Sequence, residues 1–145
     1  MKALLQRVLS ASVTVNNKEV SKISNGLLVF LGVEKKDTSE KAEYLARKIA
    51  NLRIFEDENQ KMNLSVQDIK GQILIVSQFT LAASIANGNR PGFENAEDLK
   101  IAKELYEYFS KEFKKYNIPV QNGIFQADMK VCLINDGPVT FMLEK

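Results

Sequence analysis

The 145-residue sequence contains no histidine. Histidine is the only side chain whose unperturbed pKa allows easy proton transfer near neutral pH. Its absence excludes Ser-His-Asp triads, Cys-His pairs and metal sites that depend on imidazole. An enzyme built from this chain must therefore use a perturbed Lys, Asp, Glu or Tyr, an activated Ser or Thr, or a reacting group that the substrate itself supplies.

Cysteine is nearly as scarce, because Cys132 is the only one. A single cysteine excludes an internal disulfide and a cysteine-based zinc site, so no metal is expected. Cys132 lies in an apolar run, which favours a buried structural thiol over a reactive one. A glycine-rich phosphate loop is also missing from the sequence, and we therefore expect no nucleotide cofactor.

Long apolar runs are missing too, since no stretch approaches the roughly 20 residues that cross a bilayer, and the N-terminus lacks the pattern of a signal peptide. We therefore expect a soluble, cytoplasmic protein with no membrane partner. The 20 basic and 18 acidic residues give a net charge of +2. That charge is too small to indicate a nucleic-acid partner by itself. The length fits one domain, 1–145, and no internal repeat or linker divides it.

Strands are expected at both ends of the chain. The predicted strands alternate apolar and polar residues or form short apolar runs bounded by turn residues such as Asn16-Asn17. A run such as 27–33, which is almost continuously apolar, indicates a strand buried on both faces. The segments predicted as strands are 3–8, 11–15, 19–23, 27–33, 72–80, 118–121, 129–134 and 139–143.

Two helices are expected between these strands. The first covers about 38–52, where apolar residues recur at helical spacing and Asp37 with Glu40 has the spacing of a capping box. The second begins near Asn95, after a loop over 82–94 that is rich in turn formers such as Asn87-Gly88-Asn89, and Leu99 is expected on its buried face. Two helices among many strands indicate an α+β fold with a largely antiparallel sheet.

The segment Ser77-Gln78-Phe79-Thr80-Leu81 ends a predicted buried strand just before the long loop. Rigid strand ends that lead into open loops often carry functional groups, and two hydroxyls and an amide occur together here. The alternative is a strand that simply reaches the surface, with Phe79 in the core and Thr80 facing water. The pattern alone favours this alternative, because short motifs have many false positives.

A second segment, Asn135-Asp136-Gly137-Pro138-Val139-Thr140, separates two apolar runs. Asp-Gly in such a place is a strong hairpin signal, and the proline that follows removes a hydrogen-bond donor and fixes φ. About 5–6% of X-Pro bonds in folded proteins are cis, and a cis Gly137-Pro138 bond would point consecutive carbonyls differently from a trans bond. The pattern alone favours an ordinary tight turn.

These two segments resemble the paired signature motifs of the D-aminoacyl-tRNA deacylase family. Further similarity to that family extends from Met1 to about residue 143, in order and at the family's spacing. The segments that carry it are Leu5-Gln6-Arg7-Val8, Ala11-Ser12-Val13, Gly26-Leu27-Leu28-Val29, Leu31-Gly32-Val33-Glu34, Arg53-Ile54-Phe55, Lys61-Met62-Asn63-Leu64, Arg90-Pro91 and Ala127-Asp128-Met129. Pro91-Gly92-Phe93 departs slightly from the family's loop.

The resemblance implies a barrel-like α+β fold and a homodimeric editing hydrolase that cleaves D-aminoacyl-tRNA, with glycyl-tRNA(Ala) as a further substrate. The catalytic residues would be Ser77, Gln78, Phe79 and Thr80. In the family the Gly-Pro bond is cis and enters the partner's active site, where it excludes L-amino acids. The residues expected to bind substrate and select its chirality are Gly137, Pro138, Leu81, Met129 and Arg7, with Arg7 bracing the turn.

The lack of histidine agrees with this resemblance, because the ribose of the substrate carries a hydroxyl beside the ester. A well-oriented neighbouring group can supply much of a rate acceleration. Backbone N–H groups near Phe79 and Thr80 are the candidates for stabilising the oxyanion. Two alternatives are an esterase with Thr80 as nucleophile, although no adjacent base activates it, and a non-catalytic RNA-binding module. The lysines that RNA would contact are 100, 103, 111, 114 and 115.

Overall fold

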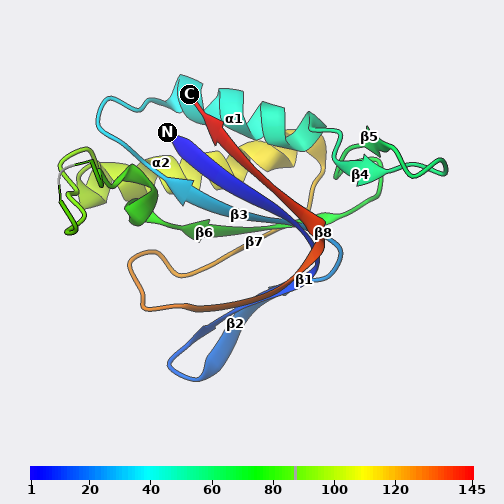
Figure 1. The fold of residues 1–145 in the computed structure, drawn as a ribbon, viewed down its shortest axis with the longest axis horizontal. Helices are drawn as coiled ribbons and strands as arrows, with labels where there is room; N and C mark the ends of the chain where they lie inside the picture. Colours follow the sequence, from blue (N-terminus) through cyan, green and yellow to red (C-terminus); the bar gives the residue numbers. More distant parts are fainter. Residues whose placement is uncertain (87) are drawn as a thin grey trace.

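The computed structural model describes residues 1–86 and 88–145, so Asn87 of the predicted turn-forming tract lies outside the described residues. Figure 1 shows two helices lying over one side of a strongly curved sheet. The strands are β1 (Lys2–Val15), β2 (Lys18–Ile23), β3 (Gly26–Gly32), β4 (Phe55–Glu56), β5 (Met62–Leu64), β6 (Gln72–Ser77), β7 (Val120–Asn122) and β8 (Lys130–Glu144). The helices are α1 (Ser39–Asn51) and α2 (Leu99–Glu112), with 3-10 turns η1 (Phe79–Ala82) and η2 (Phe113–Tyr116).

The main sheet is organised around the long strand β1. One edge of β1 pairs antiparallel with β8, and its other edge pairs first with β3 and then with β2. Strands β3, β6 and β7 run parallel, and the crossovers that parallel pairing requires contain α1 and α2. The result is an α+β fold with a mixed, nearly closed, barrel-like sheet. The predicted fold class is confirmed, and the parallel strands are the part that the sequence pattern did not indicate.

The strand β3 is buried on both faces, as its continuous apolar run predicts. Leu27, Val29 and Leu31 face α1 and α2 and join the larger core cluster. Leu28 instead faces the inside of the curved sheet, where it belongs to a second cluster with Leu74. The alternation of side chains across the two faces of a strand explains why one segment serves two cores. No helix among the described residues is long and apolar enough to cross a membrane.

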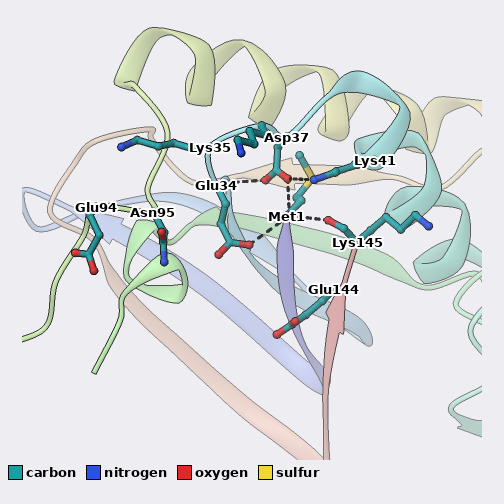
Figure 2. A pocket seen from close by; sticks show the side chains of 10 residues that line it. Met1, Glu34, Lys35, Asp37, Lys41, Glu94, Asn95, Glu144 and Lys145 are labelled. Carbon is teal, nitrogen blue, oxygen red and sulfur yellow. Dashed lines mark hydrogen bonds and ion pairs between the residues drawn. The ribbon is translucent and has the colours of Figure 1, made fainter. Parts of the chain in front are cut away.

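The first helix is confirmed, but the predicted capping box is wrong. Thr38, not Asp37, is the N-cap residue, and its side chain makes no cap hydrogen bond. The Thr38 hydroxyl instead donates to Glu40, which lowers the pKa of that carboxyl. Asp37 is drawn away from the helix end by a stronger partner, the ammonium group of Met1 (Figure 2).

The Met1 ammonium is buried between the C-terminal residue Lys145 and the loop before α1. It donates to Asp37 Oδ1 at 2.6 Å, to the Lys145 carbonyl at 2.8 Å and to Glu34 Oε2 at 3.4 Å. Lys41 Nζ also donates to Asp37 Oδ1 at 3.0 Å, as Figure 2 shows. A buried charge is tolerated when it is paired and fully hydrogen-bonded, and these contacts hold the start of β1 against the loop before α1.

Several boundaries in the second half differ from the predictions. Strand β6 ends at Ser77 instead of residue 80, and α2 begins at Leu99, where Asp98 accepts the Lys100 N–H as N-cap. The residues from Asn95 onward are not helical because they bind the chain near β3: Lys35 N donates to the Asn95 carbonyl at 2.9 Å. Leu99, expected to be buried, is 57% exposed.

The predicted hairpin at Asp136-Gly137 is also wrong, because β8 continues through it. Asn135 pairs with Val8 and Thr140 with Gln6, so residues 136–139 form a wide bulge opposite a single residue of β1. Both flanks find the same partner strand, and the chain therefore keeps its direction. Asn135 replaces part of the lost ladder, since its Oδ1 accepts the Val139 N–H at 2.7 Å. We call residues 136–139 the β8 bulge.

Cys132 is exposed, which corrects the expected buried thiol. The apolar run around it belongs to a strand, in which successive side chains point to opposite faces. Val131 and Leu133 pack against the inner core cluster. Cys132 and Ile134 therefore face the other side, where Ile134 is also exposed.

Candidate functional site

The end of β6 turns sharply into η1, and this turn carries the first signature segment. Gln78 N still donates to the Leu31 carbonyl at 2.8 Å, and Leu81 N already donates to the Gln78 carbonyl at 3.2 Å. Gly32 permits this close approach, because a Cβ there would lie 2.8 Å from Leu81 Cβ. The N–H groups of Phe79 and Thr80 open the turn, a position where backbone donors have no acceptor within the turn itself.

In this turn the Thr80 hydroxyl accepts a hydrogen bond and the Phe79 ring is exposed. Gln78 Nε2 donates to Thr80 Oγ1 at 2.6 Å, so the amide fixes the position of the Thr80 hydroxyl. Phe79 is 57% exposed and packs against Phe93 with ring centroids 5.0 Å apart. An amide donor cannot act as a base, and the Thr80 hydroxyl therefore gains orientation but no activation from Gln78.

A cavity of about 390 Å³ lies beside this turn, and we call it the β6 cavity. The predicted catalytic residues from Ser77 to Phe79 line it, and so does Met129. Thr80 and Leu81 follow in η1 and are not among its lining residues. The other lining residues are Val76, Leu99, Phe125, Gln126, Ala127, Asp128 and Val131. The volume falls in the range of small-molecule sites, roughly 300–1,000 Å³.

Sequence reasoning missed Leu99 and Phe125 as parts of this wall. Leu99 has the spacing of a buried helical residue, so its pattern pointed to the core and not to a cavity. Phe125 lies in the irregular connection between β7 and β8, which has no apolar period. The only available signal was the neighbouring Ala127-Asp128-Met129, which was recognised through resemblance alone.

Arg7 is the buried charge that shapes the second signature segment. Only 4% of Arg7 is exposed, and its Nε donates to the Asp136 carbonyl at 2.9 Å while its Nη1 donates to the Ile54 carbonyl at 2.8 Å. The Asp136 carboxylate lies 3.1 Å from Nε, and Glu56 Oε1 lies 3.5 Å from Nη2. The guanidinium thus ties the start of the β8 bulge to the body of the chain.

Gly137 and Pro138 are exposed at the tip of the bulge, and the peptide bond between them is cis. Gly137 has φ of 141°, a conformation that side chains rarely adopt. A Cβ there would lie 2.5 Å from Val139 Cγ2 and 3.4 Å from Arg7 Nη2. Glycine is therefore the residue that the local backbone requires.

One chain does not bring the two signature segments together. The bulge lies opposite Arg7, which pairs with Leu27, whereas Ser77 pairs with Leu31. Four residues along the strands and three strand spacings across them give roughly 20 Å along the sheet surface, from about 3.3 Å per residue and 4.8 Å per strand. In Figure 1 the bulge lies near the β8 label, at the opposite end of the sheet from the turn after β6.

Comparisons with known proteins point to one family. The family model described as D-Tyr-tRNA(Tyr) deacylase matches residues 4–144. The D-aminoacyl-tRNA deacylase of Geotalea daltonii is 58% identical over 144 residues, which cover 99% of this chain and 96% of the relative.

Solved structures extend the likeness. One described as c-Myc DNA Unwinding Element Binding Protein has a TM-score of 0.95 and 44% identity over 100% of this chain and 99% of its own. Another, described as a probable eukaryotic D-amino acid tRNA deacylase, has a TM-score of 0.82 over 98% of this chain and 97% of its own, and at 18% identity it shares the fold alone.

The chain belongs to the D-Tyr-tRNA(Tyr) deacylase family. It is accordingly a D-aminoacyl-tRNA deacylase, and enzymes of this class are hydrolases. The family membership confirms the resemblance that the two signature segments carry.

Proposed function

We propose that this enzyme acts in the cytoplasm and hydrolyses the ester between a D-amino acid and the terminal ribose of tRNA, releasing both. The observation that carries the proposal is the β6 cavity, whose wall includes Ser77, Gln78 and Phe79. The η1 turn that follows this wall opens with the backbone N–H groups of Phe79 and Thr80. Such donors suit the negative oxygen that forms when an ester carbonyl is attacked. No side chain with an easily exchanged proton is needed for that role.

The ribose hydroxyl beside the ester provides the missing proton transfer in this proposal. Water attacks the carbonyl carbon, and the neighbouring hydroxyl takes a proton from that water and gives one to the departing ribose oxygen. The bond between the carbonyl carbon and the ribose oxygen breaks as the acid forms. Holding the ester in one orientation is then the protein's main contribution, and proximity of this kind supplies large accelerations.

Thr80 gives the sharpest test of this mechanism, because it is the rival nucleophile. We expect Thr80→Ala to keep most of the single-turnover rate on D-tyrosyl-tRNA, and a terminal 2′-deoxyribose to slow the wild-type enzyme severely. Thr38→Ala is the matched control, since Thr38 is exposed at the start of α1. Loss of all release in a folded, tRNA-binding Thr80→Ala protein, or an acyl-enzyme seen by mass spectrometry, would refute substrate assistance.

We propose further that a second copy of the chain completes the site. The support is the separation of roughly 20 Å along the sheet between the β8 bulge and the β6 cavity within one chain. Exposed apolar residues on β8, among them Ile134, Phe141 and Met142, offer a surface for the partner. In this dimer the partner's Gly137 and Pro138 occupy the space of an L side chain, while D-amino acids and glycine pass. Glycyl-tRNA(Ala) would then also be a substrate.

A mixing experiment separates this arrangement from one within a single chain. We expect Gly137→Ala to release L-tyrosine from its tRNA, because the bulge is displaced. A second variant, Ser77→Phe, has a filled cavity and an intact bulge. With a tenfold excess of Ser77→Phe chains exchanged into the dimers, release from the L-form should fall about tenfold, since almost every open cavity then meets an intact bulge. Unchanged release after exchange would contradict the shared site.

A further inference from the structure

A second cavity, of about 660 Å³, continues from the β6 cavity along α2, and we call it the α2 groove. Phe125 lines both cavities. The neighbouring Gly123 lines the α2 groove, and a Cβ on it would lie 2.7 Å from the sulfur of Met129 in the β6 cavity. The two hollows therefore share one wall, the connection between β7 and β8.

The α2 groove is held firmly against the strand that carries the site. Tyr106 Oη, in its lining, donates to the Ile75 carbonyl at 2.8 Å, and burial raises the pKa of that phenol. Gly123 N donates to the same carbonyl at 2.9 Å. Ile75 lies two residues before Ser77 on β6, so the groove and the first signature segment are positioned by one strand.

Positive charge gathers along the helical side of the groove. Lys103, Lys111 and Lys114 line it, and Glu107 is the single acidic lining residue. Glu107 lies 3.9 Å from Lys103, with both side chains exposed. Among the described residues, neither Lys111 nor Lys114 forms an ion pair. A local excess of two positive charges stands out in a chain whose whole net charge is +2.

We infer that the α2 groove binds the phosphate backbone of the single-stranded 3′ end of tRNA, which leads the aminoacyl ester into the β6 cavity. This inference rests on the proposed function. Lys103 lies in α2 and Lys114 in the η2 turn that continues it, 11 residues further on, which is about 16 Å at about 1.5 Å per residue. A stacked strand advances about 3.4 Å per nucleotide along its axis, so a groove of this length accommodates a strand of a few nucleotides. Charge, length and continuity with the cavity all match an RNA strand.

The test compares a substrate that has upstream phosphates with one that lacks them. The variant is Lys111→Ala/Lys114→Ala, and the probes are D-tyrosyl-tRNA and the D-tyrosyl ester of adenosine. On the tRNA we expect KM to rise while the limiting rate stays at the wild-type value. On the adenosine ester we expect no change in either constant, which also shows that the variant is folded. Lys22→Ala/Lys48→Ala, which removes two exposed lysines outside the groove, is the matched control.

Salt dependence provides the quantitative readout. Each phosphate contact on a single strand contributes about 0.7 to the slope of log affinity against log salt, so two lost contacts lower the slope by about 1.4. The affinity ratio between wild type and variant should therefore shrink about sevenfold between 50 and 200 mM salt. Equal tRNA affinity and slope for wild type and variant would overturn the inference, as would equal losses on both substrates. Failure of the wild-type enzyme on both substrates would instead refute the proposed function.

Discussion

Replacing Arg7 by methionine removes the brace of the β8 bulge while keeping an unbranched, apolar side chain of similar length. The guanidinium donates to the carbonyls of Ile54 and Asp136, and both would lose their donor. The nearby carboxylates of Glu56 and Asp136 are 49% and 38% exposed, so water can replace the arginine for them. The change therefore isolates the role of the two carbonyls.

The expected loss of stability follows from those two acceptors. A buried acceptor without a partner costs about 1–3 kcal/mol. The Ile54 residue is buried and should contribute the upper part of this range, whereas the Asp136 carbonyl is closer to solvent. The sum is about 2–4 kcal/mol, which is below a typical stability of 5–15 kcal/mol. The variant should therefore still fold, with its midpoint in urea lowered by about 1–2 M for a slope near 2 kcal/mol per M.

The assay combines urea unfolding with amino-acid release. Besides the lower midpoint, we expect Arg7→Met to release some L-amino acid from its tRNA, because the bulge is no longer fixed, while release from the D-form persists. Glu56→Gln is the matched control, since it removes only the 3.5 Å contact of a half-exposed side chain, and should cost below about 1 kcal/mol. A midpoint for Arg7→Met within experimental error of wild type would refute the bracing argument.

Three further predictions concern the frame around the site. Asp37→Ala leaves the buried Met1 ammonium without its nearest anion. The free energy of unfolding, measured in urea, should fall by about 3–5 kcal/mol. A loss below about 1 kcal/mol would contradict this, because it would mean that water reaches the ammonium. Gly32→Ala places a Cβ against Leu81 and should destabilise the fold by about 1–3 kcal/mol. It should also slow D-aminoacyl-tRNA hydrolysis, because the η1 turn is displaced. Unchanged kinetics would mean that the η1 turn has no role in catalysis. The hydrogen bond from Asn63, followed by those from backbone N–H groups, lowers the pKa of Asp57 below its ordinary value of 3.8. The contribution of Asp57 to the free energy of unfolding is therefore present above pH 3.8 and is lost as the pH falls through the lower folded pKa. Asp57→Asn should flatten this acidic part of the plot of stability against pH, and an unchanged plot would contradict the assignment.

The parts of the fold that the sequence predicted are those in which local pattern and tertiary contacts agree. The apolar run of β3 and the helical period of α1 each indicate one structure, and the structure has both. The start of α2 was misplaced because Asn95 suits an N-cap, and Glu97 and Asp98 suit the first turn that would follow it. The first two are used elsewhere, since the Asn95 carbonyl accepts Lys35 N and Glu97 N donates to the Val33 carbonyl. Contacts between residues so far apart in the sequence cannot be recognised from a local sequence pattern.

Only part of the candidate site could be predicted from local sequence pattern. Ser77 stands at a strand end, a place where function is common, and the family resemblance extended that interpretation to its neighbours. The β8 bulge could not be predicted from pattern, because Asp136-Gly137 is a genuine turn signal whose two flanks happen to share one partner strand. The wall formed by Phe125 was missed because it depends on how the β7–β8 connection packs against α2. The sequence named Lys103, Lys111 and Lys114 as candidates for RNA contact, but it could not show that all three line one groove.

The most direct test of the central claim is the release of amino acid from matched D-tyrosyl-tRNA and L-tyrosyl-tRNA with enzyme in excess. The account predicts fast release from the D-form and none above background from the L-form. Equal release from both would leave an esterase but contradict rejection by Gly137 and Pro138. No release from either, by a folded protein that still binds tRNA, would contradict the hydrolytic function and favour a binding module.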